Sequence, residues 1–581
     1  MSAIAVPFAG CGARLARILQ TRPQVGTEGV VVIASLYFAL ASNQTFFRAV
    51  AATGALHGFN GLVTGLCLFL AIVALHVLLL GVLLNRWTTK PVLTVLLLTS
   101  AAASYFMSTY TVYLDADMLR NILHTDGKES RELVSLAALP SLLVSGVLPS
   151  ALLWRLRLRP RPLPRALLVR VGTLMLAVLV LAGALLASFQ SVSALMRNHR
   201  ELRYLITPGN YVVSLATVAH DAQADRDHRR EPVGAHARVV GRPADAKPRL
   251  LVLVVGETVR AQDWGLSGYA RQTTPQLAAL AREPDGPVNF RNVTACGSST
   301  EISLPCMFSP YGRAHYDKER IRHSESLLHV LEHAGVRTLW RDNQTGCKGV
   351  CEGLAFESFE HADIPGACTQ AGCLDEAMLH GLAERIAAQP GDQVIVLHQL
   401  GNHGPAYYAR YPAAFRRYTP ACETSDLDRC SREQIVNAYD NAVTYTDDFL
   451  ARAIGLLGAQ SGRDTALIYL SDHGESLGEN GLYLHGVPYA IAPDTQTRVP
   501  LLVWLSPQFA AARGVDLDCL RGRSDDAISQ DNLFHSVLGL MQVRTPEYDA
   551  ALDLFARCED VVAAGPRAGA ASPIATRRSR P

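Results

Sequence analysis

The sequence lacks a strong net charge, because its 54 lysine and arginine residues are almost balanced by 52 aspartate and glutamate residues. The formal charge of +2 gives no basic excess for a polyanion, so we expect no nucleic-acid partner. The sequence also lacks an internal repeat. Its 581 residues are sufficient for more than one domain.

Long apolar runs are missing from the last two thirds of the sequence and are concentrated in the first third. Five runs there are each about long enough to cross a hydrocarbon core of roughly 30 Å as a helix. They lie near residues 29–47, 60–84, 91–113, 133–153 and 166–189. This contrast predicts a membrane domain of five helices joined to a globular domain.

The first apolar run is the weakest of the five, because Asn43, Gln44 and Thr45 interrupt it. A cleaved signal peptide is the alternative interpretation. The run begins late, has no evident small-residue cleavage site and is followed by further spans. We therefore favour a membrane span over a signal peptide.

Acidic residues are missing from the loops that carry most of the arginines. The N-terminus has three arginines before its first acid, Glu28, and the segment 155–170 has six arginines and no acid. The opposite loops hold few basic residues, most of them mixed with Asp and Glu. Since basic loops stay in the cytoplasm, five spans place everything after about residue 190 outside it.

Cysteine is rare in the membrane part, where Cys11 and Cys67 are expected to be free. The other ten form the close pairs Cys296/Cys306, Cys347/Cys351, Cys368/Cys373 and Cys422/Cys430, with Cys519 and Cys558 in addition. An even, clustered set is typical of disulfides in an oxidising compartment. A structural zinc site is the alternative, since two of the pairs have roughly ligand-like spacing. We favour disulfides because of the predicted topology, and the sequence leaves their connectivity open.

A connector, residues 190–248, joins the two parts. Its first half mixes apolar and basic residues, which is compatible with a helix along the membrane surface or with a plain linker helix. Its second half is polar and predicts an exposed loop. The full division is a cytoplasmic N-terminus (1–28), a transmembrane domain (29–189), the connector, a catalytic domain (249–560) and a basic, disordered tail (561–581).

The globular part alternates short β-branched runs with helical patterns, which predicts an α/β fold with a mostly parallel sheet. Three strands are clear, at 250–255, 393–398 and 465–470. Each leads into residues that bind metals or move protons, namely Glu257, His403, and Asp472 with His473. Because ligands bind at the carboxyl ends of such strands, we expect these side chains to meet at one edge of the sheet.

Asp472 and His473 are adjacent in the segment SDHGESLGENGLYLHG, which also contains His485. A carboxylate and an imidazole on the turn after a buried strand can bind one divalent ion, and Gly474 permits a tight turn. His485 is near enough in sequence to return to the same site. The alternative for the dipeptide alone is that Asp472 caps a following helix and His473 is an ordinary loop residue.

A candidate nucleophile lies in the segment TACGSSTEISLPCMFS. Thr300 comes just before a predicted helix, where backbone N–H groups favour an anionic group such as phosphate. A threonine hydroxyl needs a base or a metal to become a good nucleophile, and zinc would lower its pKa. A bridge between Cys296 and Cys306 would hold this loop. Simple N-capping by the Ser/Thr run is the alternative.

Taken together, five motifs resemble a known family. They are Gly256-Glu257-Thr258, CGSST around Thr300, WRDN at 340–343 with Lys348, NHGP at 402–405, and SDHGESLGENGLYLHG. In order and spacing they resemble the phosphoethanolamine transferases of Gram-negative bacteria, most of all the lipid A branch that includes colistin-resistance enzymes. The resemblance covers about residues 30–555.

The resemblance implies five transmembrane helices in the inner membrane and a periplasmic domain of the alkaline phosphatase/sulfatase type. It implies a catalytic Zn²⁺ bound by Glu257, Thr300, Asp472 and His473. Thr300 would attack phosphatidylethanolamine and carry phosphoethanolamine to lipid A. His403 and His485 would hold substrate phosphate, bind a second metal or protonate the leaving group. We expect a monomer.

Further substrate contacts follow from the same resemblance. Asn121, Thr125 and Glu129 match the family's donor-binding stretch and recur at a spacing of four, as on one helix face. Glu129 would meet the ethanolamine ammonium. Thr345 and Lys348 match polar residues beside the phosphate site.

One departure from the family concerns the nucleophile segment, Ser298-Ser299-Thr300-Glu301, where relatives commonly have Thr-Ser-Thr and a small residue. Glu301 either weakens binding of a phosphate donor or points away along the helix.

Three other functions are compatible with parts of the pattern. A phosphatase or sulfatase of the same fold lacks support, because the Cys/Ser-x-Pro-x-Arg context of sulfatases is absent around Thr300. A glycerol-phosphate polymer transferase is disfavoured by the cysteine pairs and by the predicted donor-binding stretch. A transporter is disfavoured because only His76 stands deep in a predicted span. Core sugar or another periplasmic glycan stays open as the acceptor.

Overall fold

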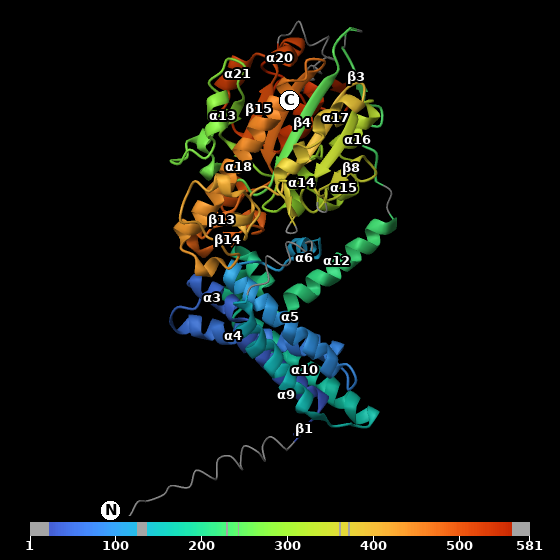
Figure 1. Cartoon of the computed structure of the whole chain (residues 1–581). Helices are drawn as coiled ribbons and strands as arrows, with labels where there is room; N and C mark the ends of the chain where they lie inside the picture. Colours follow the sequence, from blue (N-terminus) through green and yellow to red (C-terminus); the bar gives the residue numbers. More distant parts are fainter. Residues whose placement is uncertain are drawn as a thin grey trace, which may run out of the picture. The chain divides into compact units, whose positions relative to one another are not determined.

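The computed structural model describes residues 22–124, 136–227, 230–241, 243, 245–359, 362–369 and 372–559 (Figure 1). The chain forms two compact units, with the boundary between Arg226 and Asp227. The first unit is helical, and the second contains a seven-stranded sheet.

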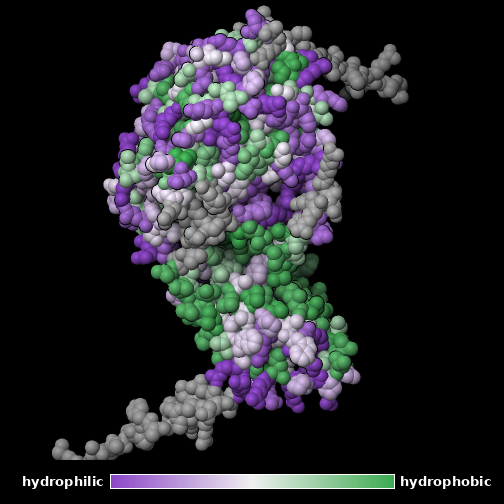
Figure 2. All heavy atoms as spheres, turned by 45° about the vertical axis from the view of Figure 1, so that its right-hand side comes forward, coloured by the Kyte–Doolittle hydropathy of each residue, from purple (hydrophilic) through white to green (hydrophobic). Residues whose placement is uncertain are grey.

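The first unit consists of long apolar helices and shorter connecting helices. In chain order its helices are α2 (Thr27–Tyr37), the π-helical η1 (Phe38–Ser42), α3 (Gln44–Ala52), α4 (Gly58–Leu83), α5 (Thr89–Tyr110), α6 (Ala116–His124), α8 (Ala138–Leu142), η2 (Leu143–Val147), α9 (Leu148–Arg155), α10 (Leu163–Ala187), α11 (Phe189–Asn198), η3 (Arg200–Leu205) and α12 (Gly209–Asp227). Figure 2 shows apolar residues over much of the surface of these helices, as expected for a protein that faces lipid.

Within the described residues, four helical stretches are long and apolar enough to span a membrane. They are Gly58–Leu83, Thr89–Tyr110, Ala138–Arg155 and Leu163–Ala187. A fifth candidate consists of two segments, Thr27–Ser42 and Gln44–Ala52, which are bent by 51° at their junction. The predicted count of five therefore holds only if the bent pair is one span. Residues 133–135 of the predicted fourth span lie outside the described residues.

The bend falls at Asn43, where the sequence pattern weakens. The side chain is buried, and its amide nitrogen donates to the carbonyls of Phe38 (2.9 Å) and Thr207 (2.6 Å). The Asn43 side-chain oxygen accepts from the Thr207 N–H at 3.0 Å. Because apolar surroundings make every unpaired backbone group costly, this asparagine satisfies the Phe38 carbonyl at the break and also pairs with the backbone of Thr207.

The connector is more structured than the sequence predicts. Its first half is largely helical, in α11, η3 and α12. In its second half, β3 (Arg238–Val239) pairs antiparallel with β17 (Val543–Arg544), and Val233 and Ala237 are buried in the core of the second unit. The prediction of an exposed loop is therefore wrong for Val233, Ala237 and the paired strand β3, whereas most other described residues of this stretch are exposed or half-buried.

The second unit contains a mostly parallel sheet, as predicted. The strand order is β5 (Val288–Phe290), β15 (Leu501–Leu505), β12 (Asp464–Ser471), β4 (Arg249–Gly256), β11 (Gln393–His398), β7 (Arg337–Asp342) and β8 (Phe356–Ser358). Only β15 runs antiparallel to its neighbours. All eight residues of β4 and of β12 are buried, which explains why both read as continuous apolar runs.

Helices cover both faces of the sheet. The main ones are α13 (Pro275–Leu280), α14 (Thr300–Met307), α16 (Leu327–His333), α17 (Leu382–Ala388), α18 (Arg432–Gly458), α20 (Pro507–Arg513) and α22 (Asp531–Leu540). Alternate residues of β4, namely Leu251, Leu253 and Val255, enter one core together with the apolar residues of α16 and α22. The longest helix, α18, begins with a capping box between Ser431 and Gln434.

Five disulfides cross-link the second unit. They join Cys296 to Cys306, Cys347 to Cys351, Cys368 to Cys373, Cys422 to Cys430 and Cys519 to Cys558. The prediction of disulfides is confirmed, and the alternative of a structural zinc site on these cysteines is wrong. Cys67 is free, and Cys11 lies outside the described residues.

We predict that Leu253→Ala destabilises the second unit by about 2–5 kcal/mol, because it opens a cavity in a fully packed sheet. The matched control is Phe356→Ala on the edge strand β8, where the removed side chain is larger but 44% exposed. Thermal unfolding of the purified full chain measures both variants. An equal loss for the two would contradict this account of the core.

Candidate metal and phosphate site

The strand register brings two segments of the chain to one edge of the sheet. Ser471 at the end of β12 pairs with Gly256 at the end of β4. Glu257 and Asp472 therefore follow their strands side by side. The neighbouring strands β7 and β11 also end in register, at Asp342 and His398. The predicted convergence at this edge follows directly from parallel pairing.

Glu257, Asp472 and His473 form a fully buried cluster whose ligand atoms all lie within 4.8 Å of one another. Nε2 of His473 lies 3.4 Å from Oε1 of Glu257 and 3.4 Å from Oδ2 of Asp472. Two carboxylates and an imidazole thus share one buried space. Such an arrangement of acceptors needs a cation or protons to offset it.

Backbone contacts fix how Asp472 and His473 face the cluster. Asp472 Oδ1 accepts from the N–H groups of Thr258 (3.2 Å) and His473 (2.7 Å), and no helix follows it, so Asp472 is not a helix cap. Its Oδ2 accepts no hydrogen bond among the described residues. His473 Nδ1 lies 2.9 Å from the Gly474 carbonyl, to which it must donate, so Nε2 carries its lone pair into the cluster.

These three residues fit a metal ion. Burial lowers the pKa of His473, so its ring is neutral and does not itself offset the carboxylates. A neutral imidazole nitrogen and carboxylate oxygens are ligands that zinc prefers. The Asp472 oxygen that accepts no hydrogen bond faces the same space, which a divalent cation would fill.

Thr300 completes the cluster. It is the first residue of α14, and its hydroxyl donates to Glu257 Oε2 at 3.0 Å and lies 3.3 Å from His473 Nε2. The N-cap Ser299 makes no side-chain capping bond, so N-capping does not account for this Ser/Thr run. The disulfide between Cys296 and Cys306 encloses the segment. Glu301, which follows Thr300, is half-exposed.

His403 and His485 lie beside this cluster. The ring centroid of His485 is 4.5 Å from that of His473 and 5.3 Å from that of His403. Burial lowers the pKa of His403, and the nearby His485, Arg410, His473 and Lys348 lower it further. The structure thus brings both predicted histidines to the site, within the electrostatic reach of a lysine and an arginine.

Glu475 holds His485 in place, a contact that the sequence did not reveal. His485 Nδ1 lies 2.8 Å from Glu475 Oε2, and the Tyr407 hydroxyl donates to Glu475 Oε1 at 2.6 Å. The loop that carries His485 is also tied to the nucleophile segment, because the Gly486 N–H donates to the Ser298 carbonyl and the Ser298 hydroxyl donates to the Val487 carbonyl.

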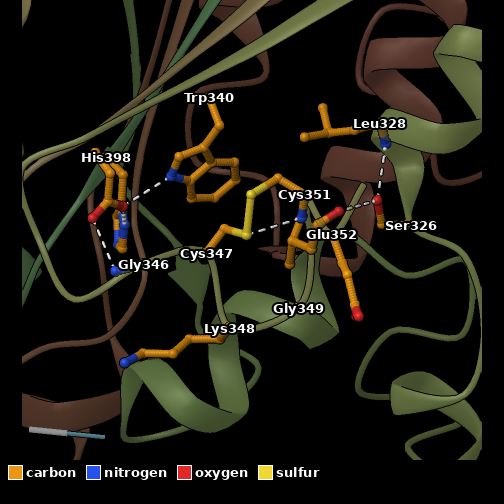
Figure 3. The surroundings of a disulfide bond; sticks show 12 residues. Ser326, Leu328, Trp340, Gly346, Cys347, Lys348, Gly349, Cys351, Glu352 and His398 are labelled. Carbon is orange, nitrogen blue, oxygen red and sulfur yellow. Dashed lines mark hydrogen bonds and ion pairs between the residues drawn. A yellow bond between two sulfur atoms is a disulfide. The ribbon is translucent and has the colours of Figure 1, made fainter. Parts of the chain in front are cut away.

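Lys348 lies in a loop that is clamped on two sides (Figure 3). On one side, Asp342 accepts from the Trp340 indole (2.9 Å) and the Gly346 N–H (2.9 Å), and its Oδ1 lies 2.7 Å from His398 Nδ1. On the other side, the Cys347–Cys351 disulfide closes the turn. Lys348 therefore projects from a fixed backbone, and its ammonium donates to Thr345 Oγ1 at 2.7 Å.

Gln344 connects this loop to the cluster and was also missed from the sequence. Its Nε2 donates to Glu257 Oε2 at 3.1 Å, and its Oε1 accepts from the Thr345 hydroxyl at 2.6 Å and from the Thr345 N–H. Gln344 thus links Thr345 and Lys348 to Glu257. Gln344 directly follows the WRDN motif, but the sequence does not show its contact with Glu257.

Of the three predicted donor-binding residues, the structure describes one, which belongs to the first unit. Asn121 lies on α6, and Thr125 and Glu129 lie outside the described residues. Their part in binding stays a prediction.

A mostly parallel sheet with a buried hydroxyl, two carboxylates and histidines at its carboxyl edge is typical of the alkaline phosphatase/sulfatase class. Comparison with known families agrees with this class. The sulfatase family model matches residues 249–543, and the model for the phosphoethanolamine transferases EptA/EptB matches residues 72–222.

Similarity to individual proteins identifies the family within this class. The chain is 38% identical over 543 residues to phosphoethanolamine transferase EptA of Salmonella typhimurium, covering 92% of this chain and 98% of the relative. It is 38% identical over 507 residues to phosphatidylethanolamine transferase Mcr-1 of Escherichia coli, covering 84% and 91%. The solved structure of the integral membrane lipooligosaccharide phosphoethanolamine transferase A from Neisseria meningitidis matches with a TM-score of 0.88, 35% identity, and 92% and 100% coverage. The chain belongs to the phosphoethanolamine transferase family.

We predict that Gln344→Ala weakens zinc binding by about 10–100-fold, because Glu257 loses the amide that orients it. The matched control is Gln393→Ala, which removes an equally buried glutamine with two backbone contacts on β11. Competition with a chelator measures zinc affinity in both. Wild-type affinity in Gln344→Ala would show that Gln344 does not position a ligand.

Proposed function

We propose that this chain transfers phosphoethanolamine from phosphatidylethanolamine to a lipid A phosphate through a phospho-threonine intermediate at a zinc site. The contact of the Thr300 hydroxyl with both Glu257 and His473 is the observation that carries the proposal. Similarity to phosphoethanolamine transferase EptA and phosphatidylethanolamine transferase Mcr-1 supports the donor and the transferred group. We further propose that the helical unit lies in the inner membrane, with the second unit in the periplasm.

Thr300 is the proposed nucleophile. A threonine hydroxyl attacks phosphorus slowly unless its proton is removed, and Glu257 Oε2 at 3.0 Å is placed to accept that proton. Zinc, held by Glu257, Asp472, His473 and Thr300, would stabilise negative charge at this edge as a Lewis acid. Since Thr300 begins α14, the N–H groups of the first helical turn also favour the donor's phosphate.

In the first half of the reaction, Thr300 Oγ1 forms a bond to the donor phosphorus and the bond from phosphorus to the glycerol oxygen breaks. That oxygen takes a proton from His485, whose ring faces the Glu475 carboxylate, and leaves as diacylglycerol. Phosphoethanolamine stays on Thr300. Lys348 and the two histidines hold the phosphoryl oxygens during this transfer.

In the second half, an oxygen of the lipid A phosphate attacks the same phosphorus, and the bond from phosphorus to Thr300 breaks. The Thr300 oxygen regains its proton from the Glu257 carboxyl group, and the attacking lipid A phosphate gives its own proton to His485. Asn121, Thr125 and Glu129 are proposed to bind the donor headgroup, with Glu129 against the ammonium. Both substrates are lipids, which explains why the catalytic domain is tethered to a membrane domain.

We predict that Thr300→Ala abolishes phosphoethanolamine addition to lipid A, measured by mass spectrometry of lipid A from cells that express each variant. Thr300→Ser retains the hydroxyl and is expected to keep part of the activity. Continued modification of lipid A by a folded, inserted Thr300→Ala protein would falsify the proposed nucleophile. If the wild-type protein modifies another glycan instead, the acceptor is wrong and the nucleophile is retained.

We also predict that Asp472→Asn loses zinc and activity together. Asparagine keeps the Oδ1 acceptor for the two backbone N–H groups, so the fold is retained, but the charge toward the metal is lost. Elemental analysis of the purified variant and the lipid A assay give the two readouts. Full zinc content with normal transfer activity would show that Asp472 is not a metal ligand.

A further inference from the structure

The helical unit ends in a surface that is almost entirely cationic. Three segments form it: residues 22–28, 85–90 and 154–170, here called the arginine surface. They contain nine cations, namely Arg22, Arg86, Lys90, Arg155, Arg157, Arg159, Arg161, Arg165 and Arg170, and one carboxylate, Glu28. Glu28 lies 2.5 Å from Arg161 and 3.8 Å from Arg170, so it cannot offset the remaining positive charge.

Backbone pairing and side-chain contacts hold the three segments together, so the arginine surface has a defined structure. β1 (Gln24–Val25) pairs in parallel with β2 (Arg157–Leu158), and the N–H groups of Arg157 and Arg159 donate to the carbonyls of Pro23 and Val25. The Lys90 ammonium donates to the Trp154 carbonyl at 3.2 Å. The side chains of Arg157 and Arg159 therefore extend from a backbone that is fixed by hydrogen bonds.

The arginine surface also has the composition of a membrane interface. Trp87 and Trp154 are 73% and 55% exposed, although tryptophan is usually buried in soluble proteins. The Arg86 guanidinium lies 4.2 Å from the Trp87 ring centroid, and the Trp154 indole donates to Thr94 at 2.9 Å. Exposed leucines of α10, including Leu163 and Leu167, continue the surface into the apolar helices. Exposed tryptophans between cations and leucines mark the depth of lipid headgroups.

Arginine is the cation best suited to phosphate, because its planar guanidinium binds two oxygens at once. Eight of the nine cations are arginines. Arg157, Arg159 and Arg165 have exposed side chains, and none of them forms an ion pair among the residues that the structure describes. A solvated surface would need neither this bias toward arginine nor the exposed tryptophans.

We propose that the arginine surface is a binding site for the phosphate headgroups of anionic phospholipids. It shares no residue with the transfer site, and the lipids it takes differ from the zwitterionic donor in carrying net negative charge. The proposal requires that the helical unit lies in a membrane, and it does not depend on the chemistry at Thr300. Headgroups bound at the arginine surface would fix the depth and orientation of the helical unit in its bilayer.

The test is native mass spectrometry of the full chain in detergent, with equal amounts of phosphatidylglycerol and phosphatidylcholine. We expect wild-type protein to retain phosphatidylglycerol preferentially. The variant Arg157→Gln/Arg159→Gln/Arg165→Gln is expected to lose that preference by about tenfold or more. The control Arg282→Gln/Arg337→Gln/Arg429→Gln removes the same charge from exposed positions of the second unit and is expected to behave as wild type.

A thermal unfolding experiment distinguishes a lipid headgroup from free phosphate as the ligand. Phosphatidylglycerol is expected to raise the thermal unfolding midpoint of the wild-type chain, and inorganic phosphate at the same concentration is not. Equal effects of the two would mean a phosphate site and would overturn the lipid proposal. Equal retention of both lipids by wild type, or an equal loss in the two triple variants, would also overturn it. Loss of transferase activity bears on the proposed function alone.

Discussion

The site depends on one constraint, the parallel pairing of β4 with β12. Because Gly256 and Ser471 are in register, the next residues of the two strands, Glu257 and Asp472, are forced into the same buried space. His473 adds a neutral ring nitrogen to the two carboxylates. Two carboxylates so close together in a buried space are unfavourable without a cation, and a divalent metal would offset their charge.

The surrounding loops hold the remaining groups against this edge. The Cys296–Cys306 disulfide encloses Thr300, and the Cys347–Cys351 disulfide encloses Lys348. Neither loop belongs to the sheet, and each would lose conformational definition without its cross-link. Glu475 and Gln344 then orient His485 and Glu257 through buried hydrogen bonds. The disulfides and these hydrogen bonds thus hold the reacting side chains in fixed positions relative to the sheet.

Much of this arrangement could be predicted from the sequence, because local patterns encode it. The strands β4, β11 and β12 are continuous apolar runs, and the polar residues after them mark the site. The interruption at Asn43 marked the bend in the first candidate span. Long-range pairing could not be predicted in this way. The contact of Gln344 with Glu257 and the pairing of β3 with β17 join residues far apart in sequence, and no local pattern records them.

The most direct test of the central claim is X-ray diffraction from crystals of the full chain at the zinc absorption edge. The account predicts an anomalous peak bound by Glu257, Asp472, His473 and the Thr300 hydroxyl, with one nitrogen and three oxygen ligands. A zinc-loaded protein with no peak between these residues, or with zinc only at other side chains, would contradict the claim that the paired strand ends build a metal centre for Thr300.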